Sequence, residues 1–483
     1  MKKRILAAML TLSMVVSMTA CGNSEAGGSK DSAKNNGNGD EPYTVTMVLN
    51  GSTQPDEERI EQKINEILEP ELNANLDIVV LPWASASQQL QLMLSGDEKI
   101  DVFYTQATNA VQYMNAGQII DMSELIDKYG TNIKQIYGED IAKINQIEGF
   151  VYGVPNQIER GSIPAIFMRK DLVEKYNFDW ENVKTVEDMY PFWDAIRDNE
   201  PGLYPVGDLS IQAFEDDYVA MRMIQDYYTV AGSGASSFYI KKGDDSYTVD
   251  WYPDVVKEYR REFGELYEKG YIRDDIITLQ DDSADITAGK YASRLGIIKP
   301  GGEAEQKQLA GGYDYVQIAL TEPFVNSLSA RAAMNAVSSS SKNPEAAIRM
   351  IDVMNTDKEI FNMLNFGIEG TNYTMEDGFV KEIPDSGYFF NSGWALGNQF
   401  NAYLVEGQQE GVWEETMEIN NNAEVSPISG FSFNEDPVAT AMAQMSSVTS
   451  EYKFIGLYDD FDTRFEEFRP KMEQAGVLCL SFQ

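Results

Sequence analysis

Beyond Pro42 the chain alternates between short apolar segments and longer amphipathic ones, and this alternation limits the folds it can adopt. Residues 43–49 are rich in Val and Thr and indicate a strand, and residues 55–68 carry apolar side chains at helical spacing. Residues 76–81 form an apolar run typical of a strand buried on both faces. Residues 101–104 indicate a third short strand. Strands that alternate with helices predict an α/β fold whose mainly parallel sheet is covered on both sides.

The ends of these predicted strands should lie close together. In an open parallel sheet, ligands bind beyond the carboxyl ends of the strands. The loops after Leu49, Leu81 and Tyr104 are therefore expected to share one rim of the sheet.

The N-terminus has the pattern of a secretion signal. A cationic cluster at residues 2–4 precedes an apolar stretch at residues 5–16, which is too short to cross about 30 Å of hydrocarbon as a helix. We therefore predict a signal peptide over residues 1–20. Residues 17–21 place small side chains before a cysteine and resemble the lipobox of bacterial lipoproteins. That resemblance implies that the Cys21 thiol carries a diacylglycerol and becomes the mature N-terminus. An ordinary secretion signal with an incidental cysteine is the alternative.

The segment behind the lipid should be a tether. Residues 21–42 consist mainly of Gly, Ser, Asn, Lys and Asp and have little to bury. Two or three acyl chains anchor a protein stably, whereas one chain binds only marginally. Because no later segment approaches 18 consecutive apolar residues, the Cys21 lipid is the only membrane attachment we expect. This places the protein at the cell membrane, on its extracytoplasmic side.

The charge balance and the lack of histidine exclude several functions. The sequence has 38 Lys and Arg, 77 Asp and Glu and no His, for a formal net charge of −39. Such a surface repels nucleic acid, which we exclude as a partner. Without His, a Ser-His-Asp nucleophile, a His-ligated zinc site and a histidine pH switch are impossible. Lipidation of Cys21 would leave Cys479, in an apolar run, as a buried thiol without a disulfide partner.

Several segments of the chain together resemble the extracellular solute-binding proteins of bacterial ABC importers, and among them the large sugar-binding type. The matching segments are residues 95–103, 117–125, 149–155, 167–172, 288–292 and 342–347. Each pattern is weak alone, but their order and spacing hold along most of the chain. Residues 365–373 and 397–400 look like a sub-branch of these lipoproteins with a C-terminal extension.

The resemblance implies two α/β lobes of the periplasmic-binding-protein-like fold, joined by a hinge, with a ligand cleft between them. Lobe one would comprise residues 43–162 plus 286–325, and lobe two residues 163–285 plus 326–483 with the extension. The implied function is to capture an extracellular oligosaccharide by lobe closure and to deliver it to the permease subunits of an ABC importer. Such a protein is a monomer, is not an enzyme, and needs no cofactor or metal ion.

A carbohydrate site needs flat aromatic surfaces and side chains that both donate and accept hydrogen bonds, because a sugar ring has an apolar face and a polar rim. Eight residues of these types lie in segments that the fold or the resemblance places at the cleft. They are Trp83, Tyr104, Gln106, Asn156, Asp216, Glu303, Trp394 and Asn398.

Four of these candidates lie in residues 43–162, the first part expected to form lobe one. Trp83 follows the second predicted strand, with core packing as the alternative. Tyr104 and Gln106 follow the third strand, where sugar-binding relatives present an aromatic ring and polar groups. Asn156 lies near the expected crossover between the lobes, where a plain turn is an equally good explanation.

Of the other four candidates, three lie in the residues expected to form lobe two, and Glu303 lies in residues 286–325, expected in lobe one. Trp394 is the stacking platform that we expect in lobe two, because it shares a glycine-punctuated loop with Asn398; core packing is the alternative. Asp216 lies among aromatic residues and could accept hydrogen bonds from sugar hydroxyls, although a solvated helix start explains it as well. Glu303 follows a predicted strand at a place where relatives face the cleft.

Two other functions stay open. A glycoside hydrolase would need two carboxylates about 5 to 9.5 Å apart across a cleft, and the many acidic residues make such a pair easy to form. A surface sensor or peptide-binding lipoprotein would have the same fold but a function other than carbohydrate import. The acidic run at residues 281–285 lacks the spacing of a calcium-binding EF-hand loop, so we expect it to be solvated surface.

Overall fold

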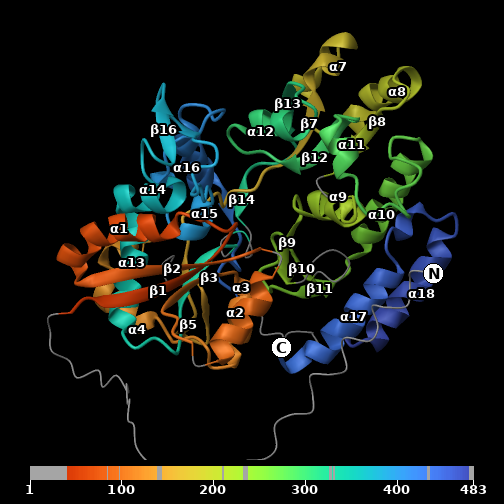
Figure 1. Ribbon diagram of the computed structural model, residues 1–483. Coiled ribbons are helices and arrows are strands. Elements are labelled where there is room, and N and C mark those ends of the chain that lie inside the picture. Colours follow the sequence, from red (N-terminus) through yellow and green to blue (C-terminus); the bar gives the residue numbers. More distant parts are fainter. Residues whose placement is uncertain are drawn as a thin grey trace, which may run out of the picture. The chain divides into compact units, whose positions relative to one another are not determined.

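The computed structural model describes residues 41–83, 85–96, 98–138, 144–208, 211–231, 238–325, 329, 332–431 and 436–477 (Figure 1). The predicted signal peptide, the lipidation site Cys21, almost all of the tether and Cys479 lie outside these residues. From Pro42 onward the chain forms one compact unit. No helix among the described residues is long and apolar enough to span a membrane.

Lobe one is built on a five-stranded sheet with the strand order β2-β1-β3-β15-β6. β1 runs parallel to β2 and β3, whereas β15 is antiparallel to β3 and β6. The strands are β1 (Tyr43–Asn50), β2 (Ala74–Leu81), β3 (Val102–Thr105), β6 (Val154–Pro155) and β15 (Met334–Val337). The three strands predicted from the sequence are present, and their parallel pairing confirms the α/β class.

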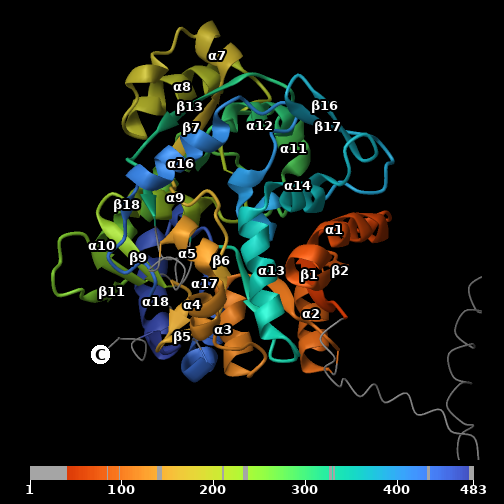
Figure 2. The same ribbon diagram turned by 90° about the vertical axis from the view of Figure 1, so that its left-hand side faces the viewer.

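Alternation along β1 explains why both faces of this sheet are covered. Val45, Met47 and Leu49 belong to one hydrophobic core, while Val48 belongs to a second. Successive side chains of a strand face opposite sides, so each face needs its own cover. The covering helices are α1 (Glu57–Leu72), α2 (Ala86–Ser95), α3 (Ala107–Asn115), α4 (Ser123–Tyr129), α5 (Thr131–Tyr137), α13 (Pro344–Thr356), α14 (Lys358–Phe366) and α15 (Gly393–Leu396). Figure 2 shows α13 beside β1 and α4.

Helix α13 begins at a side-chain cap. The Asn343 side chain accepts a hydrogen bond from the Ala346 N–H, and Pro344 occupies the first turn, where its missing N–H costs nothing. Ile351 and Met354 then bury one face of the helix completely in the lobe-one core. The cap and the buried face thus both favour a helix over the same residues.

Lobe two contains two sheets. A four-stranded sheet has the order β13-β7-β12-β8, with β12 parallel to β8 and antiparallel to β7, and a three-stranded antiparallel sheet has the order β11-β10-β9. The strands are β7 (Pro164–Arg169), β8 (Tyr204–Gly207), β9 (Tyr227–Ala231), β10 (Phe238–Lys241), β11 (Val249–Trp251), β12 (Tyr291–Ile297) and β13 (Tyr315–Ala319). The helices are α7 (Lys170–Lys175), α8 (Tyr190–Asn199), α9 (Phe214–Met223), α10 (Asp254–Glu268), α11 (Ser283–Thr287), α12 (Gly302–Leu309), α17 (Ala439–Glu451) and α18 (Phe461–Gln474).

The C-terminal helices complete lobe two. Phe465 and Phe468 of α18 share a hydrophobic core with Trp251 of β11 and with Val256 of α10. The extension is therefore packed into the lobe and is not an appendage.

The remaining short elements are β4 (Gln146–Ile147), β5 (Phe150–Val151), β14 (Phe324–Val325), β16 (Tyr373–Glu376), β17 (Phe379–Glu382), β18 (Glu424–Val425), α16 (Val412–Asn422) and the 3-10 helices η1 (Trp180–Asn182), η2 (Glu187–Met189), η5 (Gln399–Asn401), η6 (Asp436–Val438) and η7 (Ile455–Leu457).

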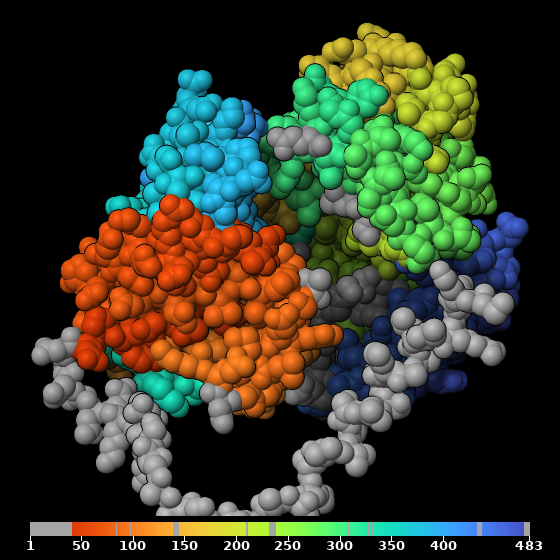
Figure 3. Space-filling model, viewed as in Figure 1, coloured from red at the N-terminus to blue at the C-terminus, as the bar shows by residue number. Residues whose placement is uncertain are grey.

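Two segments lie in the opposite lobe from the one we expected. Residues 286–325, expected in lobe one, contain β12 and β13, which pair with β7 of lobe two. Residues 333–405, expected in lobe two, contain β15, α13 and α14, which share the core of β1. Figure 3 shows the light-blue surface of β16 and β17 beside the red surface of α1, as expected for residues that belong to lobe one. A hydrogen bond from the Asp56 N–H to the Gly387 carbonyl also joins this segment to lobe one. An apolar pattern shows that a segment is buried, but not against which sheet it packs.

Three chain segments connect the lobes. The first comprises residues 156–163, the second contains β14, and the third contains β18. Ser162 of the first segment and Phe324 of β14 exchange two backbone hydrogen bonds, of 2.8 and 3.0 Å. β18 pairs in parallel with β14. The three segments are therefore joined to one another by backbone hydrogen bonds.

Asn420 of α16 braces the first of these segments. Its Oδ1 accepts hydrogen bonds from the Arg160 and Gly161 N–H groups, both at 2.8 Å, and its Nδ2 donates to the Ile158 carbonyl at 2.9 Å. A Cβ on Gly161 would lie 2.8 Å from Ile419 Cγ2, so only glycine lets α16 approach this closely.

Candidate functional site

The carboxyl ends of β1, β2 and β3 form one rim of the lobe-one sheet, as predicted. Asn50 at the end of β1 lies opposite Leu81 at the end of β2, and the Gly51 N–H donates to the Leu81 carbonyl at 2.9 Å. Val48 of β1 pairs with Phe103 of β3. The loops that leave these strands therefore start side by side.

Three aromatic residues, Trp83, Tyr104 and Trp394, gather at this rim and form what we call the aromatic cluster. The Trp83 and Trp394 rings are stacked, with centroids 5.4 Å apart and planes inclined by 16°. The Tyr104 ring meets both edge-on, at 6.0 Å from Trp83 and 5.6 Å from Trp394. Tyr104 is buried, whereas Trp83 and Trp394 are 46% and 37% exposed. A stacked indole pair that is half open to solvent offers a flat apolar surface for a ligand.

Trp394 lies in lobe one and not in lobe two, where we expected it. It is part of α15, whose Ala395 and Leu396 are completely buried in the lobe-one core. The preceding loop also returns to the lobe-one rim, where the Asn391 N–H donates to the Asn365 carbonyl of α14 at 2.8 Å. The aromatic cluster is consequently a feature of a single lobe.

Two buried asparagines hold the α15 segment from behind. Asn156 Nδ2 donates to the Trp394 carbonyl at 2.9 Å. Asn335 Nδ2 donates to Asn156 Oδ1 and to the Leu396 carbonyl, both at 2.9 Å. Asn156 was selected from the sequence as a ligand contact, and the structure places its amide beneath the aromatic cluster.

Tyr104 and Gln106 lie at the junction of β3 and α3. Gln106 is the exposed residue that immediately precedes α3. Burial raises the pKa of the Tyr104 hydroxyl above its ordinary value, and the Gln106 side chain opposes that rise. The hydroxyl therefore stays protonated at neutral pH and can act as a hydrogen-bond donor.

A cavity of about 690 Å³, which we call the charged cavity, lies where the first connecting segment enters lobe two. Residues from that segment, from β7, from the end of β12 and from α12 line it. Among them are Glu159, Phe167, Ile297, Lys299, Gln306 and Leu309. Phe167 is buried beneath the cavity, whereas Ile297 and Leu309 are about half exposed. The cavity therefore combines apolar surface with charged groups.

The charged groups of this cavity are paired with one another. Lys299 Nζ lies 2.7 Å from Glu305 Oε2. Burial raises the pKa of the Glu159 carboxyl, the charge of Lys299 opposes that rise, and Glu305 adds to it. Burial lowers the pKa of Lys299. The hydrogen bond to Glu305 and the charge of Glu159 have a larger, opposite effect, so the pKa of Lys299 is raised overall. With two carboxylates around one ammonium group, these residues carry an excess of negative charge.

A buried arginine fixes one polar side chain of the charged cavity. Arg294 Nη1 donates to Gln306 Oε1 at 3.0 Å, and its Nε and Nη2 donate to the Asp208 carbonyl at 3.2 and 3.1 Å. Arg294 is 1% exposed. The orientation of the Gln306 amide is thereby set before any ligand arrives.

Glu303 and Asp216 lie apart from the lining of this cavity. Glu303 is in the first turn of α12, near the lining residue Gln306 but not among the residues that line the cavity. Asp216 Oδ1 accepts a hydrogen bond from Arg260 Nη2 at 2.7 Å, and the same guanidinium lies 3.2 Å from the buried Glu215 carboxylate. The Asp216 carboxylate is therefore engaged inside lobe two.

Asn398, the last of the eight candidates, serves the backbone around the aromatic cluster. Its Oδ1 accepts a hydrogen bond from the Phe400 N–H at 3.2 Å, and its Nδ2 donates to the Asn355 carbonyl at 3.3 Å. The structure thus brings Trp83, Tyr104 and Trp394 together and gives Asn398 a supporting position.

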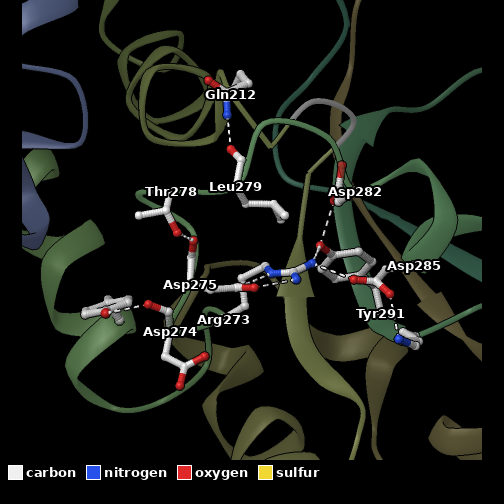
Figure 4. A network of polar contacts seen from close by, with 11 residues as sticks. Gln212, Arg273, Asp274, Asp275, Thr278, Leu279, Asp282, Asp285 and Tyr291 are labelled. Atoms are coloured by element: carbon white, nitrogen blue, oxygen red, sulfur yellow. Dashed lines mark hydrogen bonds and ion pairs between the residues drawn. The ribbon is translucent and has the colours of Figure 1, made fainter. Parts of the chain in front are cut away.

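The acidic run at residues 281–285 is engaged in a polar network (Figure 4). Asp282 accepts a hydrogen bond from the Tyr291 hydroxyl at 2.6 Å. Asp285 lies 2.9 Å from Arg273 Nη1 and 2.6 Å from Lys290 Nζ. These contacts attach the loop to β12, so the run is more than solvated surface. Within the described ranges, no group of three or more acidic or Cys side chains could hold a metal ion.

Sequence reasoning missed Asn335 and Glu159. Asn335 is a polar residue between Met334 and Ala336, and such an interruption of an apolar strand was the available signal. Glu159 lies three residues after Asn156, on the segment that the resemblance already placed at the crossover. Neither residue belongs to a recognisable motif, so only the fold identifies its neighbours.

Comparison with protein families gives two matches. The model of the bacterial extracellular solute-binding protein family matches residues 71–364, which is more than half of the chain. The model of a domain of unknown function matches residues 427–478, the segment that contains α17 and α18.

One relative matches most of the chain and another matches about a third of it. A carbohydrate ABC transporter substrate-binding protein of Streptococcus pneumoniae serotype 4 is 25% identical over 459 residues, which cover 93% of this chain and 90% of the relative. The diacetylchitobiose-binding protein DasA of Streptomyces coelicolor is 28% identical over 156 residues, 32% of this chain and 34% of DasA.

Solved structures share the fold. The N-glycan transport solute-binding protein NgtS of Streptococcus pneumoniae has a TM-score of 0.75 and 21% identity, with 90% of this chain and 96% of that protein covered. A solute-binding protein of a Bifidobacterium longum infantis transporter, described as binding HMO, has a TM-score of 0.63 and 17% identity over 91% of this chain and 97% of its own. Both likenesses support the two-lobed α/β fold.

Proposed function

Because this chain belongs to the bacterial extracellular solute-binding protein family, we propose that it captures a carbohydrate outside the cell and delivers it to the permease of an ABC importer. The ligand is an oligosaccharide held in the cleft between the lobes, which close around it without making or breaking a bond. The protein acts as a monomer.

The aromatic cluster is the observation that carries this proposal. Trp83 and Trp394 present a half-exposed stacked pair at the carboxyl edge of the lobe-one sheet, braced edge-on by Tyr104. The apolar face of a sugar ring fits such a surface, and its hydroxyl rim needs donors and acceptors nearby. The exposed Gln106 offers these in lobe one, and Lys299, Glu159 and Gln306 offer them at the charged cavity.

The relatives support the same ligand class. The names of two relatives and of the solved structure NgtS refer to carbohydrate, diacetylchitobiose and N-glycan. The relatives are named as binding proteins and not as hydrolases, so they give no support to the glycosidase alternative.

A thermal-shift screen tests the ligand class. The chain from Pro42 onward, which is one compact unit, is melted with neutral oligosaccharides of two to six sugars and with a panel of oligopeptides. A ligand present at 100 times its Kd stabilises the folded state by about 2.7 kcal/mol. We expect stabilisation by at least one oligosaccharide and by none of the peptides. Stabilisation by peptides alone would overturn the carbohydrate assignment.

The membrane attachment is a separate part of the proposal. Cys21 is expected to carry the lipid, with residues 1–20 removed, so the full chain should partition into the membrane fraction on the extracytoplasmic side. Cys21→Ala should release it into the soluble fraction, because the lipid is the only anchor expected. Retention of the Cys21→Ala variant in the membrane fraction would contradict lipid anchoring and leave the ligand assignment untouched.

A further inference from the structure

We propose that Asn156 and Asn335 are positioning residues that hold Trp394 in its stacked position against Trp83. The inference deepens the proposed function, because it concerns how the aromatic cluster is set for a ligand. Asn156 is 2% exposed and Asn335 is completely buried, so neither amide is at the surface of the protein.

The need for these amides follows from the length of α15. A helix leaves its last four carbonyl groups without partners inside the helix, and α15 has only four residues, Gly393–Leu396. A single turn is also too short to be stable alone. Asn156 Nδ2 and Asn335 Nδ2 donate to the carbonyls of Trp394 and Leu396 at 2.9 Å each. The two asparagines therefore satisfy carbonyls that the helix itself cannot satisfy.

The entry to α15 is held in the same way. The Ser392 N–H donates to Asn365 Oδ1 at 2.9 Å, and the Asn391 N–H donates to the Asn365 carbonyl at 2.8 Å. The backbone is thus fixed on both sides of Trp394. Its ring, being 37% exposed, is not held by burial alone, and its position depends on this fixed backbone.

The two asparagines also tie Trp394 to the chain segments that leave lobe one. The Asn156 N–H donates to the Ala333 carbonyl at 2.9 Å, and the Gln399 N–H donates to the Gln157 carbonyl at 3.0 Å. Asn156 begins the first connecting segment, and Asn335 follows the second. The stacking platform and the connecting segments therefore share one hydrogen-bonded unit.

The chemistry of the pair explains why amides are needed. Asn335 Nδ2 serves two acceptors, Asn156 Oδ1 and the Leu396 carbonyl, while its own Oδ1 accepts no hydrogen bond from the described residues. Only donors are used at this position. Asn335→Asp keeps the size of the side chain and removes both donors, and it places a carboxylate against two oxygen acceptors.

Asn362 provides a matched control. It is 2% exposed in the same lobe, and its Nδ2 donates to the carbonyls of Lys358 and Asn401 at 2.7 and 2.9 Å. Asn362→Asp removes the same kind of bonds from an equally buried amide. It takes part in none of the three hydrogen bonds by which Asn156 and Asn335 support α15.

The experiment measures the stacked indoles without any ligand, so its outcome is independent of the carbohydrate assignment. Near-ultraviolet circular dichroism of the chain from Pro42 onward is recorded for the wild type and for Trp394→Ala, and their difference defines the band of the stacked pair. Asn156→Ala and Asn335→Asp should lose this band as Trp394→Ala does, and Asn362→Asp should keep it at temperatures where each variant remains folded. If Asn335→Asp does not fold, Asn156→Ala, which removes two hydrogen bonds without introducing a buried charge, decides the question. An unchanged band in a folded Asn156→Ala variant, or an equal loss in Asn362→Asp, would overturn the proposal.

Discussion

The aromatic cluster of lobe one and the charged cavity of lobe two are built in opposite ways. The cluster has no charged side chain, its rings contact one another, and buried amides fix the backbone of Trp394. The charged cavity relies on Lys299 and Glu305, whose side chains are 37% and 55% exposed, and on the half-exposed apolar residues Ile297 and Leu309. Long exposed side chains are held loosely, because a surface ion pair contributes only about 0 to 1 kcal/mol.

The difference suggests a division of labour. A preset surface binds a ligand at a smaller entropic cost than one that must be ordered first. Lobe one would therefore supply most of the affinity through a surface ready in advance, and the charged cavity would adjust to the ligand and select by charge. The predictions below test this division, from the largest expected effect to the smallest.

The largest effect is expected for removal of either indole. Trp394→Ala or Trp83→Ala should weaken binding of the most stabilising neutral oligosaccharide by about 2 kcal/mol, a roughly 30-fold rise in Kd, because each removes half of the stacking surface. Titration calorimetry measures the effect. Leu92→Ala, which removes a 74% exposed side chain from α2 of the same lobe, is the control and should leave Kd unchanged. Unchanged affinity in both tryptophan variants would place the ligand elsewhere.

A smaller effect is expected when the charge of the cavity changes. Two carboxylates surround one ammonium group there, so a uronate oligomer should bind more weakly than a neutral oligosaccharide of equal length. Glu159→Gln removes one repulsive charge and should narrow this difference by about 1 kcal/mol, or roughly fivefold. Competition titrations with both ligands provide the measurement. A difference that Glu159→Gln leaves unaltered would mean that the cavity does not select by charge.

Stability against pH should depend on the outer edge of lobe one and not on the aromatic cluster. Burial, assisted by the charges of Glu61 and Asp77, raises the pKa of Glu57 on α1 from 4.5 to about 7. A raised pKa means stability that is complete below pH 4.5 and is lost as the pH rises to about 7. After allowance for solvent screening of this half-buried group, Glu57→Gln should be about 1 kcal/mol more stable than the wild type at pH 8 and equal to it at pH 4. Urea unfolding of both proteins at pH 4 and pH 8 measures this difference. Equal free energies of unfolding for the variant and the wild type at pH 8 would contradict the raised pKa of Glu57.

The smallest effect is expected at the exposed ion pair. Lys299→Met combined with Glu305→Gln should change the free energy of unfolding by less than about 0.5 kcal/mol and Kd for a neutral oligosaccharide by less than about threefold. Thermal melts and calorimetry of the double variant supply both numbers. A loss as large as that of Trp394→Ala would show that lobe two carries as much of the binding as lobe one.

Local sequence patterns predicted the first three strands of lobe one better than they predicted the placement of residues 333–405. The alternation of strands and helices located β1, β2 and β3, and the rule for parallel sheets placed Trp83 and Tyr104 at one rim. The sequence could not show that residues 333–405 return to lobe one, because the apolar stripes of α13 and α14 fit either core. Trp394, predicted as a stacking platform of lobe two, is a partly exposed ring of lobe one.

The supporting residues were harder to predict because their roles arise from long-range contacts. Asn335 and Asn156 are separated by 179 positions and share a hydrogen bond at 2.9 Å. Asn420 and Gly161 are likewise 259 positions apart. No spacing rule connects such pairs. Only the antiparallel pairing of β15 with β6, and the approach of α16 to the first connecting segment, brings them together.

The central claim is that a carbohydrate lies on the stacked indoles of lobe one, and fluorine NMR tests it most directly. The chain has six tryptophans, and 5-fluorotryptophan labelling gives each its own resonance, which Trp83→Phe and Trp394→Phe variants assign. During titration with chitin oligosaccharides and mannose-containing N-glycan fragments, the resonances of Trp83 and Trp394 should shift most and saturate together. Saturable carbohydrate binding that leaves both resonances in place, or no response to any of these glycans, would contradict the account.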